Sequence, residues 1–228
     1  MSWPQAILFD LDGTLVDSAA DMAGALNHVL SEDGFPELSI ADVTGMIGGG
    51  IPLLIERALI AHGEKPTAER VESIYPRYRE AYVPRAVETT CPFPGIVEVL
   101  ESFRSAGVGL GVCTNKPEDV SHVILEKLDL APFFGTVIGG DTLPVKKPDP
   151  APVLEGLKRL GCKSADGLMV GDSAADANAA KAAGVRAILV TFGYSQEPIH
   201  ELPNNGIVDS YSEFPEVVAR LASVSTMS

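Results

Sequence analysis

Two aspartates near the start of the chain, separated by one residue, carry side chains that can bind a metal ion or act as a nucleophile. Asp10 and Asp12 directly follow a short apolar run, residues 6–9, that is typical of a buried strand. At a strand end the chain leaves the sheet, so both carboxylates can turn into one crevice. Carboxylates this close repel each other, and a divalent cation would relieve the repulsion. The pair indicates a metal-assisted site with a possible aspartate nucleophile, the alternative being an Asp-Gly turn.

Three further groups of polar residues follow predicted strands. The groups are Thr114 and Asn115 at the end of residues 108–114, Lys146 and Lys147 in the loop after residues 136–139, and Asp172 and Asp176 after residues 167–171. Each group could instead have a purely structural role. Thr114 could cap a helix, Asp176 could complete a capping box with Ser173, and the two lysines could be a solvated pair.

The carboxyl ends of parallel strands meet along one edge of a sheet, so these groups would converge in one crevice. Such a set suits phosphoryl transfer. One carboxylate attacks phosphorus, a second protonates the leaving oxygen, and a lysine and a metal ion offset negative charge. Oxygen ligands favour Mg²⁺ over zinc, and the four scattered histidines do not indicate a histidine metal site.

The elements that must position these residues alternate between strand and helix in the later part of the chain. The predicted strands are residues 108–114, 136–139, 167–171 and 185–191, and the predicted helices are residues 95–106, 117–128, 151–160 and 174–183. This alternation predicts an α/β fold with a doubly wound parallel sheet, a Rossmann-like core.

Residues 16–84 interrupt the alternation directly after the first strand. They hold helical patterns at residues 19–30, 52–61 and 68–82 and no convincing strand. We therefore expect two domains. A Rossmann-like catalytic core comprises residues 1–15 and 85–228, and an inserted α-helical cap domain comprises residues 16–84.

The composition narrows the possible partners. The chain has 228 residues and a formal charge of −14, which argues against nucleic acid or an anionic membrane as partner. Three cysteines without close spacing indicate neither a disulfide framework nor a zinc site. No run of about 18 apolar residues could span a membrane, and no signal-peptide pattern is present. We expect a cytoplasmic monomer or homodimer that acts on a small molecule.

In order and spacing, the four groups resemble the motifs of the haloacid dehalogenase-like phosphohydrolases, and the resemblance covers essentially the whole chain. It implies that Asp10 is the nucleophile and that Asp12 is the general acid and then the base. The implied Mg²⁺ ligands are Asp10, Asp172 and the carbonyl of Asp12, supported by Thr14 and Asp176. The implied phosphate ligands are Thr114, Asn115 and Lys147, with Lys146 as the lesser possibility.

The presence of Asp12 bears on the reaction that the resemblance implies. Dehalogenases of this family lack a second aspartate there, because no leaving oxygen needs a proton. Its presence points to phosphate esters instead. The inserted helices resemble the family's cap, which closes over small substrates and excludes water.

The inserted segment also bears on the substrate. The amides of Gly49 and Gly50 could contact it, although a flexible turn before a helix is the alternative. Together with residues 17–19 and 139–141, this pattern is similar to that of bacterial phosphoglycolate phosphatases, which implies 2-phosphoglycolate as substrate. Arg57 could meet a substrate carboxylate or face solvent.

Other functions share parts of this pattern. The substrate could be another small phosphate, such as a sugar phosphate or pyrophosphate, and a sugar-phosphate mutase would return the phosphoryl group to sugar. A phospho-aspartate signalling switch also uses an aspartate, Mg²⁺, a hydroxyl and a lysine. Against the switch, the acidic pair follows the first strand, and the chain is too long for one small domain.

Overall fold

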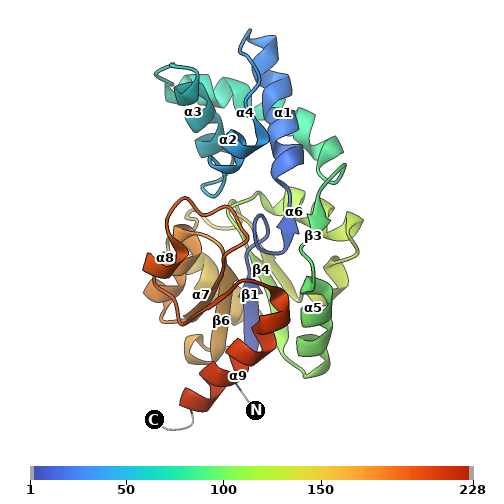
Figure 1. Cartoon of the computed structure of the whole chain (residues 1–228), viewed down its shortest axis with the longest axis vertical. Coiled ribbons are helices and arrows are strands. Elements are labelled where there is room, and N and C mark those ends of the chain that lie inside the picture. The colour runs from blue at the N-terminus through green and yellow to red at the C-terminus, as the bar shows by residue number, and fades with distance from the viewer. Residues whose placement is uncertain (1–2, 226–228) are drawn as a thin grey trace.

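The computed structural model describes residues 3–225, and a parallel sheet lies at its centre (Figure 1). Within this range the sheet has six strands in the order β5-β4-β1-β6-β7-β8, and all neighbouring pairs are parallel. The strands are β1 (Ala6–Phe9), β4 (Gly109–Cys113), β5 (Thr136–Ile138), β6 (Gly167–Gly171), β7 (Arg186–Val190) and β8 (Gly206–Val208).

Helices cover both faces of this sheet. They are α5 (Ile96–Ser105), α6 (Glu118–Lys127), α7 (Ala151–Arg159), α8 (Ala174–Ala183) and α9 (Phe214–Ser225). Alternate residues of a strand point to opposite faces, so Ile7 and Phe9 pack with α5, α6 and α9. Ala6 and Leu8 pack with α7 and α8. The predicted doubly wound α/β fold is therefore confirmed.

Between β1 and β4 the described chain forms a group of helices above the carboxyl edge of the sheet (Figure 1). They are α1 (Ala19–Glu32), α2 (Ile40–Thr44), α3 (Ile51–Ala61) and α4 (Ala68–Tyr82). Helix α1 packs against α2 and α4, and α3 packs against α4. The sequence analysis did not predict α2, because five residues are too few to show a helical period. The boundaries of a core and a cap domain remain a prediction.

Two segments connect these helices to the sheet and run side by side. Strands β2 (Val16–Asp17) and β3 (Cys91–Pro92) pair antiparallel. Near them, the Asp21 carboxylate of α1 accepts hydrogen bonds from the backbone N–H and the hydroxyl of both Thr89 and Thr90. Burial raises the pKa of Asp21, but these hydrogen bonds outweigh burial and lower it below its usual value. Asp21 therefore holds the returning segment against the first turns of α1.

The structure contains further elements that the sequence analysis did not predict. Strand β8 and helix α9 follow the last predicted strand, and short 3₁₀ helices connect other elements. These are η1 (Val83–Arg85), η2 (Ala131–Phe133), η3 (Ser164–Asp166), η4 (Ile199–Glu201) and η5 (Tyr211–Glu213). Among the described helices, none combines the length and the apolar character needed to cross a membrane.

Candidate active site

Three aspartates from two strand ends form one acidic cluster at the carboxyl edge of the sheet. One carboxylate oxygen from each of Asp10, Asp172 and Asp176 lies within 4.8 Å of the others. The Asp10 N–H still donates to the carbonyl of Val170 on β6, at 2.9 Å. Pairing of β1 with β6 therefore places Asp10 beside the end of β6 and the start of α8, which carry the other two aspartates.

Asp176 is held by the start of its own helix, α8. Its Oδ2 accepts hydrogen bonds from the N–H and the hydroxyl of Ser173, at 3.1 and 2.6 Å. The bond from the Ser173 N–H is one half of the capping box considered from the sequence, and the Ser173 side chain accepts from the Asp176 N–H in the other half. Gly171 permits this approach, because a Cβ there would lie 2.3 Å from Asp176 Cγ. The Asp176 carboxylate therefore takes part both in the capping box of α8 and in the acidic cluster.

Lys147 lies among the aspartates of the cluster. Its ammonium group donates to Asp176 Oδ1 at 2.5 Å and to the Cys113 carbonyl at 2.6 Å, and it lies 3.2 Å from Asp10 Oδ1. Burial lowers the pKa of Lys147, but Asp10 and Asp176 outweigh burial and raise it above its usual value. Lys147 is therefore held as a cation between two carboxylates.

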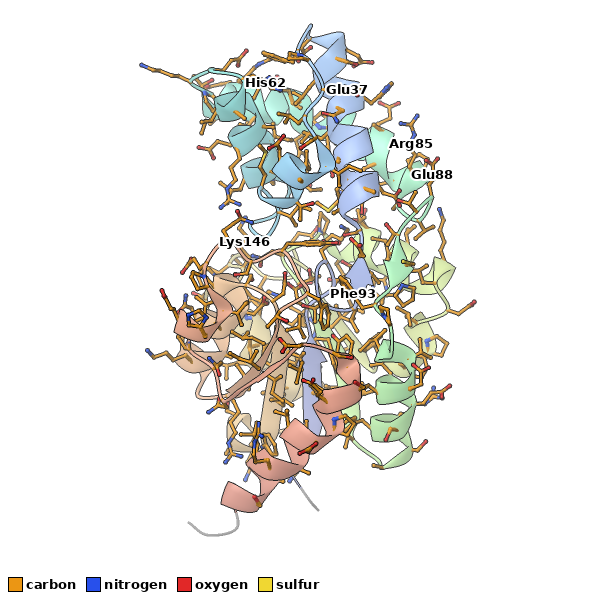
Figure 2. All side chains as sticks on the ribbon, viewed as in Figure 1. Glu37, His62, Arg85, Glu88, Phe93 and Lys146 are labelled. Atoms are coloured by element: carbon orange, nitrogen blue, oxygen red, sulfur yellow. The ribbon has the colours of Figure 1, made fainter. Side chains whose placement is uncertain are left out.

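Lys146 points away from the aspartates. Its Nζ donates to the Gly49 carbonyl at 2.7 Å, and Figure 2 shows its side chain between the inserted helices and the core. Lys146 thus joins its loop to the segment before α3. Of the two lysines in this loop, the structure places Lys147 on the acidic cluster.

The electrostatics of the cluster suit a divalent cation. Burial raises the pKa of Asp10 to about 7, and Lys147 acts in the opposite direction. Burial also raises the pKa of Asp172 well above its usual value, and the carboxylates of Asp176 and Asp10 add to the rise. A cation between Asp10 and Asp172 would lower both pKa values, and their hard oxygen atoms are ligands that Mg²⁺ prefers. These residues therefore fit a magnesium ion.

Two segments orient the Asp172 carboxylate. The Thr14 hydroxyl donates to Oδ1 at 3.2 Å, and the N–H of Tyr194 donates to Oδ2 at 2.6 Å. Gly13 has a φ of +79°, and a Cβ there would lie 2.3 Å from Asp172 Oδ2. Asp12 and Gly13 do form the Asp-Gly turn that was the alternative in the sequence analysis. This turn places the backbone of Gly13 next to the acidic cluster.

Asp12 pairs with a lysine that the sequence analysis did not single out. Lys116 Nζ lies 2.8 Å from both oxygens of Asp12, and the Ser18 hydroxyl donates to Oδ1 at 2.6 Å. Lys116 is 3% exposed, and its ammonium group lies 4.8 Å from the centroid of the Tyr82 ring. With this pair, the site has four aspartates and two lysines, an excess of acidic side chains that suits a cation.

Thr114 and Asn115 follow β4, as predicted. The Thr114 hydroxyl hydrogen-bonds to Asp10 and opposes the rise in its pKa. Asn115 Nδ2 donates to the Lys147 carbonyl at 3.0 Å and to the Gly48 carbonyl at 3.4 Å. The Asn115 Oδ1 is buried and has no hydrogen-bond partner among the described residues. Asn115 therefore joins the lysine loop to the inserted segment and presents a buried acceptor.

A cavity with about 530 Å³ of empty space, part of it open to solvent, separates the inserted helices from the sheet edge. Asp10, Asp12 and Asp172 line its floor, and the described residues that line it from the insertion are apolar or glycine. These are Met22, Ile47, Gly48, Gly50, Ile51 and Leu54. The cavity thus combines a charged floor with an apolar roof.

Two residues considered as substrate contacts lie outside this cavity. Gly49 and Arg57 line a neighbouring groove instead, whereas Gly50 lines the cavity itself. The Arg57 guanidinium donates to the Met46 carbonyl at 2.8 Å. Arg57 therefore fastens the loop before α3, and a substrate carboxylate in the cavity would need another cation.

A comparison of the sequence with models of known protein families identifies the family of this chain. A family model described as haloacid dehalogenase-like hydrolase matches residues 7–190, which include the acidic cluster, Lys147 and the inserted helices. The chain belongs to this family.

Relatives of this haloacid dehalogenase-like hydrolase match nearly its whole length. A phosphoglycolate phosphatase of Cereibacter sphaeroides is 42% identical over 215 residues, which cover 94% of this chain and 98% of that one. One of Caulobacter vibrioides is 40% identical and covers 94% and 91%. The crystal structure of a predicted phosphoglycolate phosphatase from Haemophilus somnus has a TM-score of 0.87 at 30% identity and covers 93% and 97%. The similarity includes both the sheet and the inserted helices.

In this haloacid dehalogenase-like hydrolase, Tyr194 links the acidic cluster to the first inserted helix. Its N–H donates to Asp172, while its hydroxyl accepts from the N–H groups of Ser18 and Ala19, at 2.7 and 3.1 Å. The same hydroxyl donates to Asp17 Oδ1 at 2.6 Å. The phenol thereby caps α1, whose own N-cap side chain makes no capping hydrogen bond. The sequence analysis missed this residue.

We expect Tyr194→Phe to lower the free energy of unfolding by about 1–2 kcal/mol, because the Ser18 N–H loses its acceptor and the Ala19 N–H keeps only Asp17 Oδ1 at 3.4 Å. Urea denaturation followed by circular dichroism measures the change. Tyr78→Phe is the matched control, since the Tyr78 hydroxyl is buried without a hydrogen-bond partner in the described part of the chain. Equal losses in the two variants would contradict the capping role of Tyr194.

Proposed function

We propose that this hydrolase is a magnesium-dependent phosphatase that converts 2-phosphoglycolate, a small phosphate monoester, to glycolate and phosphate. One observation carries the proposal: Asp10 and Asp12 line the same cavity, with Asp10 beside Lys147 and Asp172. This supplies a nucleophile, a second acid and a cation site beside one cavity. The relatives named phosphoglycolate phosphatases support the choice of substrate.

In the proposed reaction, Asp10 attacks phosphorus, and the bond from phosphorus to the leaving oxygen breaks as the new O–P bond forms. Asp12 gives a proton to the leaving oxygen, and glycolate departs. Asp12, now a carboxylate, takes a proton from a water molecule that attacks the phosphorus of the aspartyl-phosphate. Phosphate leaves, the Asp10 carboxylate is restored, and Asp12 again carries a proton.

Other residues of the site would hold the phosphoryl group and its charge. Thr114, Asn115 and Gly50 line the cavity and would contact phosphoryl oxygens there. Lys147 does not line the cavity, but its ammonium group lies 3.2 Å from Asp10 Oδ1 and would offset the negative charge at the attacked phosphorus. A magnesium ion would supply further positive charge to those oxygens. Its proposed ligands are Asp10, Asp172 and the carbonyl of Asp12, with Thr14 and Asp176 as positioning residues.

The proposed partner is a small phosphate ester, and neither nucleic acid nor a membrane takes part. We infer a cytoplasmic enzyme that acts as a monomer or homodimer. The charge of −14 and the three free cysteines are consistent with this inference.

A panel of small phosphate esters tests the substrate. Purified protein with Mg²⁺ should release phosphate from 2-phosphoglycolate with a higher kcat/KM than from sugar phosphates or pyrophosphate. Phosphate release measures hydrolysis directly. Comparable kcat/KM values across the panel would overturn the choice of phosphoglycolate and would indicate a general phosphatase.

Product analysis separates the remaining alternatives. With a sugar monophosphate, an isomeric phosphate in place of free phosphate would indicate a mutase. A phosphoprotein that persists without turnover would indicate a signalling switch. Steady release of inorganic phosphate is the result that the proposed phosphatase requires.

A further inference from the structure

Lys116 is a buried cation that the proposed reaction does not use. Among the described residues that line the cavity, it supplies the single lysine or arginine side chain. Its ammonium group has three N–H donors, and its polar partners are the two oxygens of Asp12 and, more weakly, Met22 Sδ at 3.9 Å. Among the described residues, the third donor faces only a thioether and an aromatic ring, so it can still bind an anion.

The position of Lys116 beside Asp12 determines which part of the substrate would lie near its ammonium group. Asp12 is the proposed donor to the leaving oxygen, and Lys116 Nζ lies 2.8 Å from both oxygens of its carboxylate. In a phosphorylated 2-hydroxy acid of two carbons, the carboxylate carbon is bonded to the carbon that carries the leaving oxygen. An anionic group so close to the leaving oxygen would therefore reach the neighbourhood of Lys116.

We propose that Lys116 binds the carboxylate of the substrate and so selects phosphorylated acids over neutral phosphate esters of the same size. This inference rests on the proposed phosphatase function and adds a residue that determines specificity. It also explains how a chain with 31 acidic and 17 basic residues could hold a substrate with two anionic groups. Lys147 would offset charge on the phosphoryl group of the substrate, and Lys116 would bind its carboxylate.

The other cations near the cavity do not line it. Arg57 and Lys146 line the neighbouring groove instead, where they donate to the carbonyls of Met46 and Gly49. Lys147 is enclosed by Asp10 and Asp176. The roof of the cavity, contributed by the insertion, offers apolar side chains and glycines among the described residues. Lys116 is thus the charged group that an additional carboxylate in this cavity would meet.

Paired substrates test the proposal directly. We compare kcat/KM for 2-phosphoglycolate and for ethyl phosphate, in which a methyl group replaces the carboxylate. In Lys116→Met, the ratio of these two values should fall by about 30-fold or more, because a buried charged hydrogen bond to the substrate is lost. Lys116→Gln, which keeps a hydrogen-bond donor near Asp12, should lower the ratio similarly. An unchanged ratio in both variants would overturn the proposal.

The ratio is informative because Lys116 also contacts Asp12. A mere loss of Asp12 orientation would slow both substrates equally and leave the ratio unchanged. Lys158→Met is the matched control, since Lys158 is 79% exposed on α7 and pairs with Glu155. This control should keep the ratio of the unmodified protein. Circular dichroism and thermal melts establish that each variant is folded.

A binding measurement separates this inference from the proposed function. Calorimetry of Asp10→Asn with Mg²⁺ gives the Kd of 2-phosphoglycolate and of inorganic phosphate without turnover. Adding Lys116→Met should raise the Kd of 2-phosphoglycolate by about 30-fold and leave that of inorganic phosphate nearly unchanged. If the unmodified protein hydrolyses neither ester, the proposed function fails. Equal Kd changes for both ligands would instead reject the role of Lys116.

Discussion

Asp10→Asn should abolish phosphate release, with kcat reduced by about 1,000-fold or more, because the amide cannot form the aspartyl-phosphate. The fold should survive. Asp10 is a half-buried carboxylate whose pKa is raised to about 7 by desolvation, so its replacement removes a partly desolvated charge. Lys147 keeps Asp176 as a partner and is not left unpaired. Phosphate release and thermal melting measure the two effects separately.

Asp129→Asn is the control for this prediction. Asp129 is exposed and has a φ of 56°, a conformation that aspartate and asparagine both tolerate. The same chemical change at that position should leave both activity and stability near those of the unmodified protein. If Asp10→Asn retains most of the activity, the assignment of the nucleophile is wrong.

Removal of Mg²⁺ should also abolish activity, and its return should restore it. Without the ion, the carboxylates of Asp10 and Asp172 lie close together with too little positive charge beside them. Phosphate release in excess chelator, and again after addition of MgCl₂, measures the dependence. Full activity in the chelator would refute the metal site.

The pKa values of these ligands add a pH dependence to the metal binding. Protons compete with the ion, because burial raises the pKa of Asp10 to about 7 and that of Asp172 well above its usual value. The affinity for Mg²⁺ should therefore increase as the pH rises toward neutrality. Calorimetry at several pH values measures it, and Asp172→Asn should weaken binding at all of them. An affinity independent of pH would contradict the competition.

Much of the acidic cluster could be predicted because its information is local in the sequence. Asp10 follows an apolar strand, and Asp172 and Asp176 stand at a strand end and in the first turn of a helix. The parallel order of the strands then brings these ends to one edge. Two adjacent lysines were harder to separate, because only the fold shows that Lys147 points into the cluster and Lys146 toward Gly49.

Lys116 and Tyr194 could not be predicted in the same way. Lys116 is 104 residues from its partner Asp12, and Tyr194 is 176 residues from the Ser18 amide that it accepts from. Neither pairing leaves a periodic pattern or a local motif in the sequence. Both depend on how the loops after β4 and β7 approach the first inserted helix, which is a property of the assembled fold.

The contacts of Asp21 have a consequence for how selectivity could evolve in this protein. Asp21 fastens Thr89 and Thr90 to α1, and β2 pairs with β3 just beside them. The outgoing and returning segments of the insertion are therefore fastened to each other at one place. Helices α2 to α4 lie beyond that place, so they could be exchanged for others without altering the connection to the sheet. New substrates could thus be acquired while the acidic cluster at the sheet edge is inherited unchanged.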